Sequence, residues 1–405
     1  DLVNGRHFSN TLCNIMRGGV FPHGYVFPRA DFLGFVGERN LPLRDAVETA
    51  LDGFDGPLTL DSALKLAEDR SDEAFARLVY EYLPLTFSRR HGDPSRPWNH
   101  FSIELDNADG SASLRYQGNW RDIFQNWEAL AISFPEYIES FIAKFVNAST
   151  ADGHNPYRIS RDGIDWEVLE PEVPWSNIGY WGDHQVVYLL RLLELSRAYH
   201  PGRLEEWLRR DLFVFADVPY RIKPYREMLR DPRRTVEYDD RCAQAVAKRV
   251  AEIGADGKLV TLRSGSIYRV NLLEKLLLVA LARLGNLVPG GGIWMNTQRP
   301  EWNDANNALV GHGLSMVTLC HLRRYLHALR DLLGESTAAS FDVSRELARF
   351  FQDAGEVLEG HRSLLDGPVS PVGRKSFMER MGSASDAYRA AVYAGFCGEK
   401  EPLAR

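Results

Sequence analysis

Apolar residues recur at helical spacing along most of the chain. Between residues 62 and 82 they fall at Leu64, Leu66, Ala67, Ala74 and Leu78, close to one helical face. Pro135 interrupts a second long pattern at 126–146. Further helices are predicted at 186–199, 236–253, 268–284, 308–333, 343–358 and 384–394. The patterns together predict roughly ten to twelve helices.

Strand patterns are few and short. Residues 98–105 and 113–116 alternate well enough to predict one small hairpin around a turn at 106–110. No alternation of strands and helices suggests a doubly wound sheet or a TIM barrel. We therefore expect an all-α fold with long loops and at most that β-hairpin. Six helical hairpins around one axis, an (α/α)6 barrel, would fit the length, with residues 1–405 forming a single catalytic-type domain.

Composition narrows the function classes. The 405 residues carry a net charge of −7, which argues against a nucleic-acid-binding surface. No apolar stretch is long enough for a secretory signal or a membrane span. The four cysteines are far apart, which excludes a zinc ribbon and favours free thiols in a reducing, cytoplasmic compartment. Because the chain begins with Asp1, it is expected to be processed or a fragment of a longer multidomain protein.

Three polar loops hold seven of the nine tryptophans. They span residues 116–127, 164–185 and 291–307, and their tryptophans are Trp120, Trp127, Trp166, Trp175, Trp181, Trp294 and Trp302. Sugar rings have apolar faces and hydroxyl edges, so a sugar site needs aromatic platforms beside forked polar groups. A single tryptophan more often belongs to the core, but this concentration favours a sugar-binding cleft.

Cleavage of a glycosidic bond needs a proton donor on the departing oxygen. Asp304 is the candidate acid because the neighbouring Trp302 could desolvate its carboxyl group and raise its pKa. The alternative is that Asp304 caps the next helix. An inverting hydrolase needs a second carboxylate as base, whereas phosphate needs only a pocket of cationic and N–H groups. Possible bases are Asp122, Asp165, Glu167, Glu170, Glu172 and Asp183.

Four stretches resemble the family 94 inverting phosphorylases, the cellobiose and chitobiose phosphorylase group within the clan of (α/α)6-barrel glycosidases. NTLCNIMRGG (10–19) resembles the segment entering the barrel, and NWRDIFQNW (119–127) resembles an arginine–aspartate–x–x–glutamine–aspartate motif. YWGDHQ (180–185) resembles a segment that opens a barrel helix. EWNDANN (301–307) resembles the aspartate–tryptophan–asparagine–aspartate–glycine motif, whose last aspartate is the general acid.

The resemblance implies roles for individual residues. Asp304 would be the catalytic acid, flanked by Trp302 and Asn303. Residues of the two other motifs would contact the sugar: Trp120, Arg121, Asp122, Gln125, Asn126, Trp181 and Asp183. The chain departs from the family pattern at Asn126, Glu301 and Ala305, and residues 298–300 and 237–285 resemble insertions. His312 and Arg17 are the only guesses for an anion pocket. No metal or cofactor is implied beyond inorganic phosphate as a co-substrate.

Three interpretations stay open at the sequence level. The first is an inverting, phosphorylase-like enzyme acting on a glucan-type oligosaccharide with Asp304 as the acid. The second is an inverting glycoside hydrolase with a carboxylate base, and the third is a non-catalytic sugar-binding barrel domain. An oligosaccharide is the expected partner in all three, with no nucleic acid and no membrane. A homodimer and additional domains of a longer chain are both compatible with the sequence.

Overall fold

The computed structural model describes residues 2–13, 19–86, 106–108, 110, 113–172, 178–180, 185–297 and 311–405, with only the backbone at 7, 9–13, 121 and 122. These residues form fifteen α-helices. They are α1 (Leu2–Cys13), α2 (Arg29–Arg39), α3 (Leu41–Asp52), α4 (Leu60–Asp69), α5 (Glu73–Glu81), α6 (Trp120–Ser133), α7 (Ile138–Asn147), α8 (Gln185–Tyr199), α9 (Arg203–Trp207), α10 (Tyr225–Arg230), α11 (Asp240–Ile253), α12 (Leu272–Leu284), α14 (Met316–Glu335), α15 (Arg345–Gly360) and α16 (Pro371–Tyr393).

Eleven short strands lie between the described helices. They are β1 (Gln117–Asn119), β2 (Arg158–Ser160), β3 (Gly163–Asp165), β4 (Phe213–Val214), β5 (Tyr220–Ile222), β6 (Val236–Tyr238), β7 (Arg269–Val270), β8 (Ile293–Trp294), β9 (Leu314–Ser315), β10 (Ser340–Ser344) and β11 (Lys400–Ala404). The order β1-β2-β3 forms one antiparallel sheet, and β4-β7, β5-β6, β8-β9 and β10-β11 pair in twos. Three short 3-10 helices are η2 (Pro135–Tyr137), η3 (Ala255–Lys258) and η4 (Arg362–Leu365).

The protein is therefore mainly helical, as predicted, but the expectation of at most one β-hairpin is wrong. The strands are mostly two or three residues long, too short to show alternation in the sequence. Several directly precede a helix: β6 occupies 236–238, which the pattern had assigned to a helix, and β10 ends where α15 begins. Strand β10 pairs with β11 in antiparallel fashion, so that Ser340 lies opposite Ala404. The predicted strand at 98–105 lies outside the described residues.

One predicted helix is two helices. The pattern at 62–82 is broken by Ser71, whose φ of 53° no helix accommodates. Asp72 then starts α5 by accepting hydrogen bonds from the amides of Ala74 and Phe75, both at 3.0 Å. The predicted break at Pro135 is confirmed, because η2 separates α6 from α7 there. Helix α16 is much longer than the predicted 384–394, since its N-terminal half is too polar to show an apolar face.

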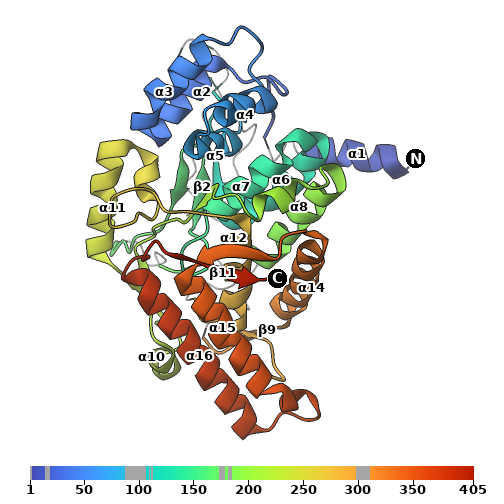
Figure 1. The fold of residues 1–405 in the computed structure, drawn as a ribbon, viewed down its shortest axis with the longest axis vertical. Helices are drawn as coiled ribbons and strands as arrows, with labels where there is room; N and C mark the ends of the chain where they lie inside the picture. The colour runs from blue at the N-terminus through green and yellow to red at the C-terminus, as the bar shows by residue number, and fades with distance from the viewer. Residues whose placement is uncertain are drawn as a thin grey trace.

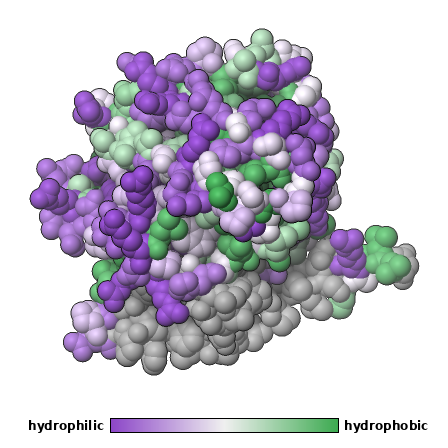
Figure 2. Space-filling model, turned by 90° about the horizontal axis from the view of Figure 1, so that it is seen from below, coloured by the Kyte–Doolittle hydropathy of each residue, from purple (hydrophilic) through white to green (hydrophobic). Residues whose placement is uncertain are grey.

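The helices pack largely in neighbouring pairs, α2 with α3, α4 with α5 and α15 with α16. Figure 1 shows α2–α5 at one end of the molecule, the α15–α16 hairpin at the other, and α1 projecting sideways. Between them, α7 packs against α5, α6 and α8, and α12 packs against α8, α14 and α15. The coloured part of the face in Figure 2 is mostly hydrophilic, with small hydrophobic areas between the hydrophilic ones. No described helix is long and apolar enough to cross a membrane.

The described cysteines agree with the sequence expectation. Cys242, Cys320 and Cys397 are free thiols. The side chain of Cys13 lies outside the described part of the structure.

Candidate functional site

The predicted site residues fall into two groups. One group starts α6: Gln125 is exposed, Asn126 is half-buried, and the side chains of Arg121 and Asp122 lie outside the description. Trp120 is fully buried, edge-on to Phe124 and Phe145, a position that favours a structural role. The other group lies outside the described residues and consists of Trp181, Asp183, Trp302, Asn303 and Asp304.

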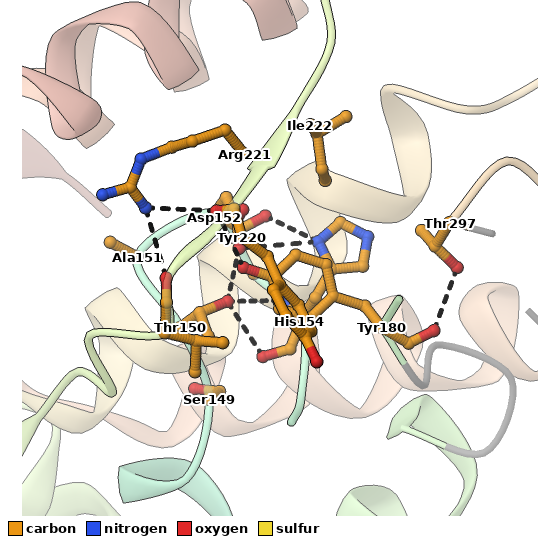
Figure 3. Close-up of polar contacts among 12 residues, drawn as sticks. Ser149, Thr150, Ala151, Asp152, His154, Tyr180, Tyr220, Arg221, Ile222 and Thr297 are labelled. Atoms are coloured by element: carbon orange, nitrogen blue, oxygen red, sulfur yellow. Dashed lines mark hydrogen bonds and ion pairs between the residues drawn. The ribbon is translucent and has the colours of Figure 1, made fainter. Parts of the chain in front are cut away.

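The described residues that lead into the two undescribed motifs are bonded to each other. The amide of Tyr180 donates to the carbonyl of Thr297 at 3.1 Å. The hydroxyl of Thr297 donates to the carbonyl of Tyr180 at 3.2 Å, as Figure 3 shows. Tyr180 and Thr297 thus lie side by side, although they are 117 positions apart in the sequence.

A loop at residues 149–157 contacts the described parts of two predicted motifs, 119–127 and 180–185. The amide of Trp120, at the start of α6, donates to the carbonyl of Tyr157 at 2.9 Å. The ring of Tyr180 stacks on His154 with centroids 5.1 Å apart. Arg283, near the end of α12, donates to the carbonyl of Gly153 at 3.3 Å and also to the side-chain oxygen of Gln185, which begins α8. The 149–157 loop therefore lies between the start of α6 and Tyr180.

The loop is held in shape by its own polar groups. Asp152 accepts from the hydroxyl of Thr150, and its other oxygen accepts from the hydroxyl of Tyr393 at 2.7 Å. The Nδ1 of His154 lies 3.0 Å from the carbonyl oxygen of Asp152 (Figure 3). Gly153 has a φ of 83°, and a Cβ there would lie 2.7 Å from the Cβ of Ala282. Glycine is required at this turn both by the backbone conformation and by the close approach of α12.

The electrostatics of the loop favour a carboxylate beside a neutral imidazole. Burial opposes ionisation of Asp152, but the adjacent His154 ring and the Thr150 and Tyr393 hydroxyls outweigh it and hold its pKa at about 2. Burial lowers the pKa of His154. The Nε2 of His154 has no hydrogen-bond partner among the described residues, and the ring lines a small polar cavity with Asn286 and Asn296.

Two other elements fix the loop from outside. Lys275, in the buried helix α12, donates to the carbonyls of Val214 at 2.6 Å and Ser149 at 3.3 Å. Tyr388, in α16, donates to the carbonyl of Ala151 at 2.8 Å. With the Tyr393 contact, the C-terminal helix thus holds the loop at two points. The loop thus forms a polar support in contact with Trp120 at the start of α6 and with Tyr180.

Sequence reasoning missed the 149–157 loop. His154 was one of eleven scattered histidines, and no motif marked Asp152. The available signal was turn chemistry: Asp152–Gly153 and Asn155–Pro156 both favour turns and lie between two polar motif segments.

The tryptophans of the three polar loops are mostly packing residues where they are described. Trp120 and Trp127 are fully buried, and Trp294 is 9% exposed with its Nε1 donating to the carbonyl of Gly311 at 2.9 Å. Trp166 is half-buried, and the ammonium of Lys258 lies 5.3 Å from its ring centroid. The prediction that these tryptophans line a cleft is wrong for Trp127 and Trp294, because both rings are buried in the packed interior.

Comparison with known families identifies one segment. Residues 21–84 match the model of the glycoside hydrolase family 149 insertion domain 1. Family 149 is a phosphorylase family related to family 94. The match indicates a carbohydrate-active, phosphorylase-type protein and supports the resemblance at the level of related families, without showing a family 94 member. No curated protein matches the chain.

The insertion-like unit, residues 21–84, contains α2–α5 and is attached through buried charges. Arg39 donates to Glu81 at 2.6 Å and to Asp256 of η3 at 3.0 Å. Arg77 donates to Glu81 at 2.9 Å and also pairs with Asp256. Asn147, at the end of α7, adds a 2.7 Å hydrogen bond to Glu81. Two guanidinium groups and two carboxylates thus join the unit to η3 and α7 in the interior.

Pairs with the partly exposed carboxylates of Asp31 and Glu38 extend this attachment towards the surface. Arg161 pairs with Glu38 at 2.5 Å and with Asp31 at 3.0 Å, and Arg115 pairs with Glu38 at 2.6 Å. The hydroxyl of Tyr82 donates to Asp31 at 2.7 Å. Because α5 also packs on α7, and α7 ends directly before the 149–157 loop, the insertion-like unit supports the helix that leads into the candidate site.

Proposed function

We propose that the chain is part of a carbohydrate-active enzyme of the phosphorylase type, which cleaves or forms a glycosidic bond in a glucan-type oligosaccharide with inversion. The observation that carries this proposal is the match of residues 21–84 to an insertion domain of a phosphorylase family. The four motifs that resemble family 94 supply independent support. The 149–157 loop adds a geometric reason, because it contacts described residues of two motifs, 119–127 and 180–185.

In the proposed reaction, Asp304 donates its proton to the bridging oxygen as the glycosidic bond breaks. An oxygen of inorganic phosphate attacks the anomeric carbon from the opposite face, giving a sugar 1-phosphate of inverted configuration and a shortened sugar. Phosphate is already anionic, so this route needs no catalytic base. Phosphate is then a co-substrate, and the proposal includes no other cofactor.

The proposed sugar contacts follow the motifs. Arg121, Asp122, Gln125 and Asn126, on the first two turns of α6, would bind the sugar in the innermost subsite. Trp302 and Asn303 would flank the acid. Trp181 and Asp183 would also contact the sugar; they follow Tyr180, which is bonded to Thr297. The (α/α)6 barrel belongs to the same proposal, since paired helices such as α15 and α16 are the units from which it is built.

Proton and phosphorus NMR of the products from a panel of β-linked glucans would test this function. We expect a sugar 1-phosphate only when inorganic phosphate is present. Asp304→Asn should lower the rate at least about a hundredfold, since general acid catalysis contributes about 10²–10⁴. The matched control Asp366→Asn changes an exposed aspartate near the α15–α16 turn and should leave the rate unchanged.

The same experiment distinguishes the alternatives. Phosphate-independent release of an inverted free sugar would contradict the phosphorylase proposal and indicate a hydrolase. Retained binding of the glucan with no turnover in either condition would instead indicate a sugar-binding domain. Equal rates for Asp304→Asn and wild type would remove Asp304 from the mechanism.

A further inference from the structure

A small cavity lies inside the joint between the insertion-like unit and the rest of the molecule. Its polar lining is Arg39 and Glu81 from the unit, Lys144 and Asn147 from α7, and Lys258 at the end of η3. The apolar lining includes Ile159 and Ile164 of the three-stranded sheet. The cavity has room for about one or two water-sized occupants.

Hydrogen-bond donors outnumber acceptors in this cavity. The Nη1 of Arg39 is buried and has no partner among the described residues, although the rest of the guanidinium is paired. The ammonium of Lys144 has three N–H groups; among the described residues it donates to the carbonyl of Arg161 at 2.9 Å and lies 5.5 Å from the centroid of the Tyr116 ring. Both side chains are at most about 4% exposed. Buried polar groups of this kind are normally hydrogen-bonded, so both are expected to have a further acceptor.

The neighbouring carboxylates are already occupied. Glu81 accepts from Arg39, Arg77 and Asn147. Asp256 accepts from Arg39, Arg77 and Asn40. These two carboxylates balance the two guanidinium charges.

When Lys144 is protonated, its charge therefore has no carboxylate in contact among the described residues. Burial lowers the pKa of Lys144 to about 7, and the nearby Arg39 acts in the same direction. Lys258, on the rim of the cavity, adds a further positive charge that is shared with Asp165 at 3.7 Å.

We propose that this cavity binds one small inorganic anion of halide size, held by the Nη1 of Arg39 and the Nζ of Lys144. Such an anion accepts a hydrogen bond from each of the two groups and supplies the missing negative charge. A neutral water supplies no charge. The room for one or two water-sized occupants favours a single halide over a larger tetrahedral oxyanion such as phosphate. The site is separate from the proposed sugar chemistry and does not depend on it.

An anion at this position would stabilise the folded protein. Arg39 belongs to the insertion-like unit and Lys144 belongs to α7, so one anion in contact with both ties the unit to the helix that leads into the 149–157 loop. An anion that binds only the folded protein raises its unfolding temperature by mass action.

Bromide provides a direct test, because its anomalous scattering identifies it in a crystal. Crystals of the protein soaked in sodium bromide should show an anomalous peak between Arg39 and Lys144. In solution, the unfolding temperature should be higher in sodium chloride than in sodium gluconate of the same ionic strength, on the order of 1–3 °C. Sodium phosphate at that ionic strength should give no such gain.

Two lysine variants separate this site from general salt effects. Lys144→Met should abolish the difference between chloride and gluconate. Lys248→Met removes an exposed lysine of α11, 3.9 Å from Glu252, and should retain it. No anomalous peak in the cavity, or equal unfolding temperatures in the two salts, would overturn the proposal. Since both measurements use the wild-type protein, they decide the matter even if Lys144→Met fails to fold.

Discussion

At the scale of single residues, buried ion pairs such as those of Glu81 hold parts of the fold together. Burial would raise the pKa of Glu81, but Arg39 and Arg77 outweigh it and hold that pKa at about 2. The carboxylate lies 2.6 Å from Arg39 and 2.9 Å from Arg77, with 2% of its side chain exposed. Removing one partner of such a pair leaves an uncompensated charge in the interior, which is why buried pairs are costly to break.

Glu81 should therefore make the protein sensitive to acid. Its pKa is lower in the folded than in the unfolded state, so its contribution to stability is complete above its ordinary pKa of 4.5 and is lost as the pH falls towards 2. In that window it adds about 1.4 kcal/mol per pH unit to the slope of the free energy of unfolding. Glu81→Gln should remove this part of the slope and, at pH 7, cost about 3–5 kcal/mol.

Denaturant unfolding at pH 7 measures the loss of stability, and unfolding between pH 5 and pH 3 measures the slope. Glu252→Gln is the control, because Glu252 is exposed and pairs only loosely with Lys248 at 3.9 Å. It should change the stability by less than about 1 kcal/mol and keep the wild-type slope. An unchanged slope in Glu81→Gln would show that this carboxylate does not carry the acid sensitivity.

At the level of elements, helix periodicity predicted most helices but few of their ends. Apolar spacing located α8 almost to the residue, because its limits coincide with the limits of the pattern. It failed at 62–82, where Ser71 and the Asp72 cap turn one pattern into two helices. It also failed at the two-residue and three-residue strands, whose existence depends on partners far away in the sequence, such as Phe213 with Val270.

A glycine at the end of α11 should be indispensable for docking the insertion-like unit. Gly254 has a φ of 93°, and a Cβ there would lie 2.6 Å from the carbonyl oxygen of Glu38 in α2. Gly202 has a similar φ of 90° but open space around its Cβ position. Gly202→Ala should therefore cost about 1–2 kcal/mol from backbone strain, and Gly254→Ala clearly more, because the backbone of α2 must also move. Thermal unfolding of the two variants makes the comparison, and equal losses would contradict this close approach.

At the scale of the whole molecule, the candidate site depends on contacts that no local pattern contains. The motifs on α6 and at 178–185 could be recognised from their residue types, but the loop that joins them could not. Asp152 is fixed by Tyr393, which lies 241 positions later, and Gly153 by Arg283. The insertion-like unit was likewise invisible as a unit, because its attachment pairs Arg39 and Arg77 with Asp256 across the fold.

We propose that the motif segments form one sugar site beside the 149–157 loop. The most direct test is a crystal structure of the Asp304→Asn variant with a β-linked glucan oligosaccharide, since this variant should bind the sugar without cleaving it. We predict sugar density against the first two turns of α6, in contact with Gln125, and close to the bonded pair Tyr180 and Thr297. Density at another surface, with the α6 face empty, would contradict the account.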